Sequence, residues 1–136
     1  MDGSRVAPLV GIVGCCLVLL ALLAPYLGLG SGAVGTYYAA GALNPLVGGL
    51  FAAVTTIVLA AGRTGRTDPA TAAGVALVFG LIVAGVSLAW SLTVPESIVF
   101  QLTTTSLIEF HRWTLALVSL VIPASGAWYT RALGLV

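Results

Sequence analysis

The chain has 136 residues, of which 60% are hydrophobic and only 7% are charged. Soluble domains carry about 25% charged residues, and a fold this small has too much surface to hide so many apolar side chains from water. All five basic residues are Arg and the formal net charge is +1, which excludes the basic patch that nucleic-acid binding needs. We therefore expect a protein of the cell membrane, with the lipid bilayer as its solvent.

The apolar residues form four long runs. A helix needs about 20 apolar residues to cross the hydrocarbon core, and continuous runs without apolar/polar alternation favour helices over barrel strands. The first run is longer than the 7–15 residues or so of a signal-peptide core, so we expect it to be retained. The expected spans, in chain order, are residues 6–27, 45–61, 71–92 and 113–133.

Turn and cap residues separate these runs. Asn44-Pro45 and Asp68-Pro69 each place a capping side chain before a proline, which is typical of a helix start. Pro123 lies inside the fourth run and is expected to kink that helix, because proline lacks a backbone N–H.

The Arg residues predict the orientation. With four spans, Arg5, Arg63, Arg66 and Arg131 fall on one side of the membrane and Arg112 on the other. The positive-inside rule then places both termini in the cytoplasm. The expected fold is all-α: one transmembrane domain over residues 1–136, a multi-pass four-helix bundle with up-and-down topology.

The segments on the other side carry most of the remaining polar residues. We expect residues 93–112 to form a loop that caps the outer end of the bundle. The aromatic residues are interpreted as belts at the two membrane boundaries: Tyr26, Tyr37, Tyr38, Trp90 and Trp113 outside, Trp128 and Tyr129 inside.

Small residues recur at four-residue spacing within two spans. Such stripes let helix backbones approach closely in lipid. They have two interpretations: packing between helices of this chain, or contact with another protomer or subunit. The candidate helix-packing residues are Gly48, Ala52 and Thr56 in the second span and Ala76, Gly80 and Ala84 in the third.

One cluster holds residue types used in catalysis and ligand binding: Glu109, His111 and Arg112. Glu109 and Arg112 are three residues apart and could pair on a helix, and His111 titrates near neutral pH. The functional interpretation is a ligand or proton site at the outer rim. The alternative is an interfacial anchor, since Trp113 follows directly.

Other chemistry has little support. Cys15 and Cys16 are adjacent in an apolar run, where a thiol stays protonated and unreactive. No spacing typical of a metal site is present, so we predict neither metal nor cofactor. Every Asp, Glu and Arg lies in a loop or at a span end, whereas ion pathways usually carry ionisable groups inside the membrane.

The whole chain resembles small uncharacterised four-span membrane proteins of halophilic archaea. The segments that carry the resemblance are residues 7–14 (APLVGIVG), 35–38 (GTYY), 44–46 (NPL) and 66–71 (RTDPAT). The resemblance implies no activity and no functional residues.

Three functions remain as hypotheses, and the sequence favours a non-enzymatic one. The first is an accessory or scaffold subunit that packs with membrane partners, either other subunits or copies of itself. The second is a small-molecule or ion pathway formed by an oligomer and lined by Ser and Thr of the spans. The third is a membrane sensor or enzyme that uses Glu109, His111 and Arg112.

Overall fold

The computed structural model describes residues 3–24, 26, 32, 35, 38–39, 44–93 and 106–135, with residues 106–110 and 112 described by their backbone alone. Within these ranges the regular structure is helical. The helices are α1 (Gly3–Leu23), α4 (Leu46–Arg63), α5 (Pro69–Thr93), α7 (Ser106–Ser119) and α8 (Val121–Ala132). Among the described residues, four stretches are long and apolar enough to cross a membrane: α1, α4, α5 and Trp113–Ala132, which combines the second half of α7 with α8.

The starts of α4 and α5 follow the cap residues in the sequence. The Asn44 side-chain oxygen accepts a hydrogen bond from the N–H of Leu46 at 3.0 Å. Asp68 precedes α5, and its carboxylate faces the N–H of Ala70 at 3.4 Å. These side chains serve backbone donors that have no partner within the first turn of a helix.

The fourth span is interrupted at Leu120, between α7 and α8. Pro123 has no N–H to donate to the carbonyl of Ser119, and its ring would crowd that carbonyl in a regular helix. At the interruption, the Leu120 N–H bonds to the carbonyl of Leu117, three residues back, and not to the one four residues back as in an α-helix. The interruption predicted from Pro123 therefore falls about one turn before the proline itself.

Glycine terminates α4 and α8. Gly65 and Gly134 have φ values of 79° and 77°, a conformation that costs a side-chain-bearing residue strain. The N–H of Arg66 bonds to the carbonyl of Ala61 in one case, and that of Leu135 to Thr130 in the other, each at 3.0 Å. Both are Schellman motifs, which satisfy carbonyls that a helix end would leave open.

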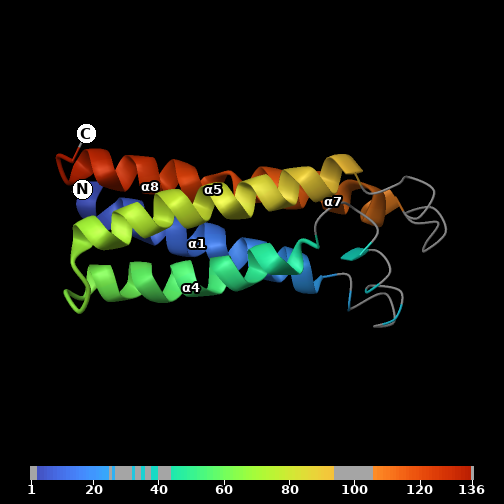
Figure 1. Cartoon of the computed structure of the whole chain (residues 1–136), viewed down its shortest axis with the longest axis horizontal. Helices are drawn as coiled ribbons and strands as arrows, with labels where there is room; N and C mark the ends of the chain where they lie inside the picture. The colour runs from blue at the N-terminus through green and yellow to red at the C-terminus, as the bar shows by residue number, and fades with distance from the viewer. Residues whose placement is uncertain are drawn as a thin grey trace.

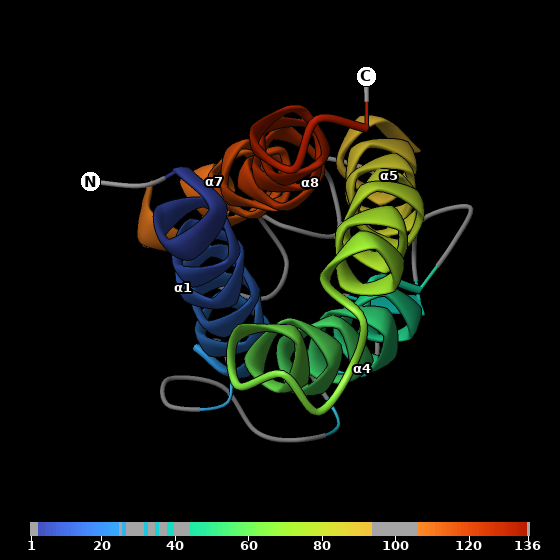
Figure 2. The same ribbon diagram turned by 90° about the vertical axis from the view of Figure 1, so that its left-hand side faces the viewer.

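The four spans form a ring around two clusters of buried hydrophobic residues. α1 packs against α4, α4 against α5 and α5 against α8, following the chain order, and α8 closes the ring against α1. Figure 2 shows this ring end-on. In Figure 1 the two termini and the α4–α5 turn lie at the same end, at the left. We call this the terminal end, and the opposite one the distal end.

Small residues bring the helix backbones together inside the ring. A Cβ added to Gly126 of α8 would lie 2.5 Å from the backbone nitrogen of Leu77, and one added to Gly80 of α5 would lie 2.6 Å from that of Pro123. Neither distance is tolerable, so α5 and α8 meet at this separation only because both positions are glycine. Of the stripe residues, Thr56 is partly buried and the others are buried: Gly48, Ala52, Ala76, Gly80 and Ala84.

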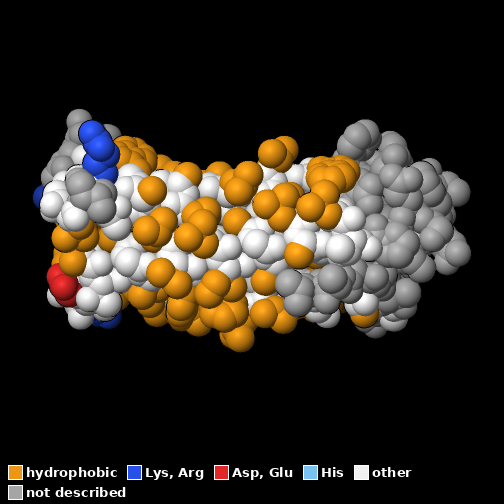
Figure 3. Space-filling view, turned by 45° about the horizontal axis from the view of Figure 1, so that its top comes forward, with side chains coloured by type: hydrophobic (Ala, Val, Ile, Leu, Met, Phe, Trp, Pro, Cys, Tyr) orange, Lys and Arg blue, Asp and Glu red, His pale blue; other side chains and the backbone are white. Residues whose placement is uncertain are grey.

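The outside of the ring is apolar. Large hydrophobic side chains are exposed along every span, including Leu20, Ile57, Leu92 and Leu117, at 63–69%. Figure 3 shows hydrophobic side chains along the length of the bundle and charged ones at the terminal end. A water-soluble monomer rarely exposes apolar patches of this extent.

Two sequence expectations are wrong. The first is that residues 93–112 form a loop: α5 runs to Thr93, and α7 already begins at Ser106, while residues 94–105 lie outside the described residues. The second is that three of the aromatic residues lie in belts that face the membrane boundaries. Tyr38, Trp90 and Tyr129 are at most 1% exposed, because position along a span does not determine which face of the helix a side chain occupies.

Candidate functional sites at the two ends of the bundle

His111 lies near the distal end and connects α7 to α1. Its Nε2 atom is 2.5 Å from the carbonyl oxygen of Ala21. A carbonyl only accepts hydrogen bonds, so Nε2 carries the proton and donates. The natural donor to Ala21 in a continuing helix would be the N–H of residue 25, four positions on, but residue 25 is a proline. His111 therefore satisfies a carbonyl that the sequence of α1 leaves without its helical partner.

Tyr38 also donates a side-chain hydrogen bond to α1, at the carbonyl that follows that of Ala21. Its hydroxyl donates to the carbonyl oxygen of Leu22. The Tyr38 ring meets Trp90 of α5 edge to face at a centroid distance of 5.4 Å, and His111 lies 6.2 Å from Tyr38 and 6.1 Å from Trp90. We call Tyr38, Trp90 and His111 the distal clasp. It joins α1, α5 and α7 with the segment that precedes α4.

Burial within the distal clasp governs the chemistry of His111. Removal from water lowers the pKa of the imidazole below its usual value of 6.5, and the hydrogen bond to Ala21 opposes that shift only in part. The neutral ring is therefore favoured at neutral pH. Since its Nε2 proton is already donated to Ala21, this arrangement serves helix packing directly.

The other two members of the sequence-predicted cluster are placed only by their backbone. Glu109 and Arg112 lie on α7, three residues apart, and their side chains lie outside the described residues. Their pairing, and their convergence with His111 on a ligand, stay predictions. Where side chains are described, no three of the types His, Cys, Asp and Glu gather as metal ligands would. Cys15 is buried, Cys16 is exposed, and both are free thiols.

A cavity of about 370 Å³ lies at the terminal end, where all four spans contribute to its wall. Its principal lining residues are Ser4 and Arg5 of α1, Gly62 and Arg63 of α4, Pro69 of α5 and Tyr129 of α8. We call it the terminal cavity. It combines two guanidinium groups and two hydroxyls, so it is a polar, positively charged hollow at one end of an apolar bundle.

Tyr129 is a buried residue in this wall. Its side chain is 1% exposed, and within the described part of the chain its hydroxyl has no hydrogen-bond partner. Gly62 keeps the space beside it: an added Cβ would lie 3.4 Å from the Tyr129 oxygen and 2.7 Å from the Cβ of Ala72. Glycine at position 62 therefore allows α4 to approach α5 closely at this end of the bundle.

The two Arg residues of the terminal cavity have no ion-pair partner among the carboxylates that the structure describes. Asp68 is the one carboxylate whose side chain is described, and it faces the first turn of α5 through Ala70 and Thr71. Among the described residues, neither Arg5 nor Arg63 has an ion-pair partner. Their positive charges therefore remain available to a negatively charged group.

Sequence reasoning missed the terminal cavity. In the sequence, Arg5 and Arg63 indicate only the topology, and Tyr129 is typical of a residue at the membrane boundary. The useful signal was that residues 5, 63 and 129 all lie near span ends that four antiparallel helices bring to one side. Whether their side chains converge depends on helix register, which the sequence pattern does not give.

Comparison with known proteins identifies a family for nearly the whole chain. Residues 1–134 match the profile of DUF7548, described as a family of unknown function. No curated protein and no solved structure matches the chain.

Proposed function

The chain belongs to DUF7548, a family of unknown function, and we propose that it is a non-enzymatic accessory or scaffold subunit of the cell membrane. In this proposal the four helices cross the bilayer as an up-and-down bundle and present an apolar outer face to lipid and to membrane partners. The single observation that carries the proposal is the contrast between that apolar outer face and the buried hydroxyls of Thr55, Ser119 and Ser125, which are bonded to carbonyls of their own helices.

The outer face supports membrane insertion. Side chains such as Leu20, Ile57 and Leu117 are exposed by more than 60% and lie on different helices of the ring. Exposure of such a side chain to water, compared with its burial, is unfavourable by about 1.5–3 kcal/mol. In a bilayer these same side chains face hydrocarbon, where they need no protein partner.

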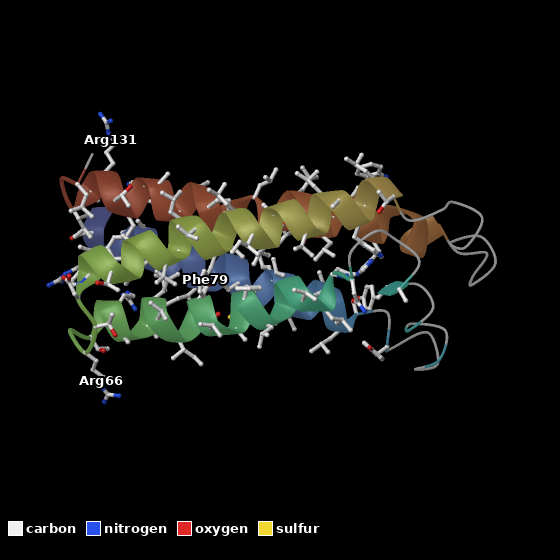
Figure 4. The ribbon with its side chains drawn as sticks, in the orientation of Figure 1. Arg66, Phe79 and Arg131 are labelled. Atoms are coloured by element: carbon white, nitrogen blue, oxygen red, sulfur yellow. The ribbon has the colours of Figure 1, made fainter. Side chains whose placement is uncertain are left out.

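The charges support a cytoplasmic terminal end. Arg66 and Arg131 point away from the bundle at this end (Figure 4), and Arg5 and Arg63 line the cavity there. Short cytoplasmic segments carry an excess of Arg and Lys. The proposal therefore places both termini and the α4–α5 turn in the cytoplasm.

The hydroxyls within the spans favour a packing role over a pathway. Thr55, Ser119 and Ser125 are at most 3% exposed and donate to carbonyls of their own helices, at 2.7 Å each. A pathway between protomers would need hydroxyls on the outer face and free to bind a solute. These three lie on the inside and are already bonded.

The proposed role is tested by extracting the protein gently from its native membrane and measuring the mass and composition of the assembly. The proposal predicts a stable complex that contains other membrane chains at fixed stoichiometry. A lone monomer, recovered under conditions that preserve other membrane complexes from the same preparation, would contradict it.

A further inference from the structure

We propose that the terminal cavity is a binding site for a phosphate group, supplied either by the headgroup of an anionic lipid or by a soluble phosphate compound. The inference goes beyond the proposed subunit role, and it rests on the proposed membrane placement only for the lipid source. Its basis is a built hollow, two guanidinium groups without an ion-pair partner in the part of the chain that the structure describes, and a buried hydroxyl without a hydrogen-bond partner there.

The cavity has the size and the chemistry for such a group. Its volume of about 370 Å³ falls at the lower end of the range of roughly 300–1,000 Å³ that small-molecule pockets occupy. Guanidinium groups bind phosphate oxygens through paired, charge-assisted hydrogen bonds. Because Arg5 and Arg63 come from two different helices, an anion bound in the cavity would link α1 to α4.

The Tyr129 hydroxyl is the second, independent indication. A buried hydroxyl that makes no hydrogen bond destabilises a fold, and Tyr129 is 1% exposed with no hydrogen-bond partner among the described residues. A phosphate oxygen in the cavity would accept its proton. Gly62 leaves the adjoining space open, since an added Cβ would lie 3.4 Å from this oxygen.

The helix dipoles distinguish Arg5 from an ordinary helix-end cation. Arg63 lies in the last turn of α4 and Arg131 in the last turn of α8, where a positive charge complements the helix dipole. Arg5 lies in the first turn of α1, where the dipole disfavours a positive charge. An anion bound in the cavity would offset the unfavourable interaction of Arg5 with the dipole of α1. The stability of α1 alone does not explain an Arg at this position.

The matched comparison uses two double variants with the same change of charge at the same end of the bundle. Arg5→Gln/Arg63→Gln removes the cavity pair. Arg66→Gln/Arg131→Gln removes two Arg that do not line the cavity and that point outward (Figure 4). The full-length protein in detergent is mixed with phosphatidylglycerol, and bound lipid is quantified by native mass spectrometry. Thermal unfolding of each variant is measured to confirm folding.

If the terminal cavity binds phosphate, Arg5→Gln/Arg63→Gln should weaken phosphatidylglycerol binding roughly tenfold or more, because charge-assisted hydrogen bonds are lost. The outward pair should change binding by no more than about twofold, because exposed charges contribute little. Tyr129→Phe removes one oxygen atom, keeps the ring, and should weaken binding severalfold in a protein that folds normally.

Inorganic phosphate distinguishes the two sources. Displacement of the lipid by millimolar phosphate would assign the cavity to soluble phosphate compounds as well, and lipid binding that phosphate leaves unchanged would assign it to the headgroup. The proposal is overturned if both double variants lose binding equally, if neither does, or if the unmodified protein binds neither probe. None of these outcomes bears on whether the protein co-purifies with membrane partners.

Discussion

His111 donates a hydrogen bond to the carbonyl oxygen of Ala21. In a regular helix this carbonyl would accept from the N–H of residue 25, but residue 25 is a proline and has no N–H. One side chain on α7 thereby completes the C-terminal end of α1, 90 positions earlier in the chain. The residue with the strongest claim to catalysis in the sequence thus has a structural task in the fold.

Replacement of His111 by alanine should lower the stability of the bundle by about 1–3 kcal/mol, because it leaves the part-buried carbonyl of Ala21 without its side-chain donor. His111→Gln is the matched control, since its amide N–H₂ can occupy the position of Nε2 and should restore most of the loss. The measurement is denaturant unfolding in detergent micelles. Equal stability of His111→Ala and the unmodified protein would show that the bond contributes nothing.

Acid should destabilise the protein through the same residue. Burial lowers the pKa of His111, so the unfolded chain binds a proton at a higher pH than the folded one. The contribution of His111 to stability is then complete above the unfolded pKa, about 6.5, and is lost as the pH falls through the lower, folded pKa. Unfolding measured from pH 7.5 downward should show this decline in the unmodified protein and a smaller one in His111→Gln. Parallel curves would assign the pH dependence to other groups.

Tyr38→Phe tests the second donor of the distal clasp. The variant keeps the aromatic contact with Trp90 but removes the hydroxyl that serves the Leu22 carbonyl, so it should cost about 1–3 kcal/mol. Tyr26→Phe is the control, because Tyr26 is 40% exposed and should tolerate the change. The two variants are compared by thermal unfolding, and a larger effect from Tyr26→Phe would contradict the arrangement.

The contact between α5 and α8 leaves no room for an added methyl group. Gly126→Ala would place a Cβ 2.5 Å from the backbone of Leu77, so the helices would have to separate, at a cost of at least about 1–3 kcal/mol. Gly85→Ala on α5 meets nothing within 4 Å and should be neutral, or stabilising by up to about 1 kcal/mol. Unfolding in detergent measures both, and a Gly126→Ala variant as stable as Gly85→Ala would mean that the helices are less closely packed.

The sequence predicts where the helices lie in the chain better than it predicts which side chains of each helix are buried. Four apolar runs indicate the spans, and Asn44 and Asp68 mark two helix starts, because composition and caps act locally. The start of α7 was missed because residues 106–112 mix polar and apolar side chains like a surface loop. Burial of Trp90 and convergence at the terminal cavity depend on how the helices rotate against one another, and no local pattern records that rotation.

The most direct test of the account is the sidedness of single cysteines in intact cells. With Cys15 and Cys16 replaced by alanine, one cysteine is introduced at Thr64, Leu135 or Gly35, three exposed positions, and treated with a membrane-impermeant maleimide. A four-span bundle with a cytoplasmic terminal end predicts that Gly35→Cys reacts in intact cells, whereas Thr64→Cys and Leu135→Cys react only after the cells are opened. Reaction of all three under the same condition would contradict the account.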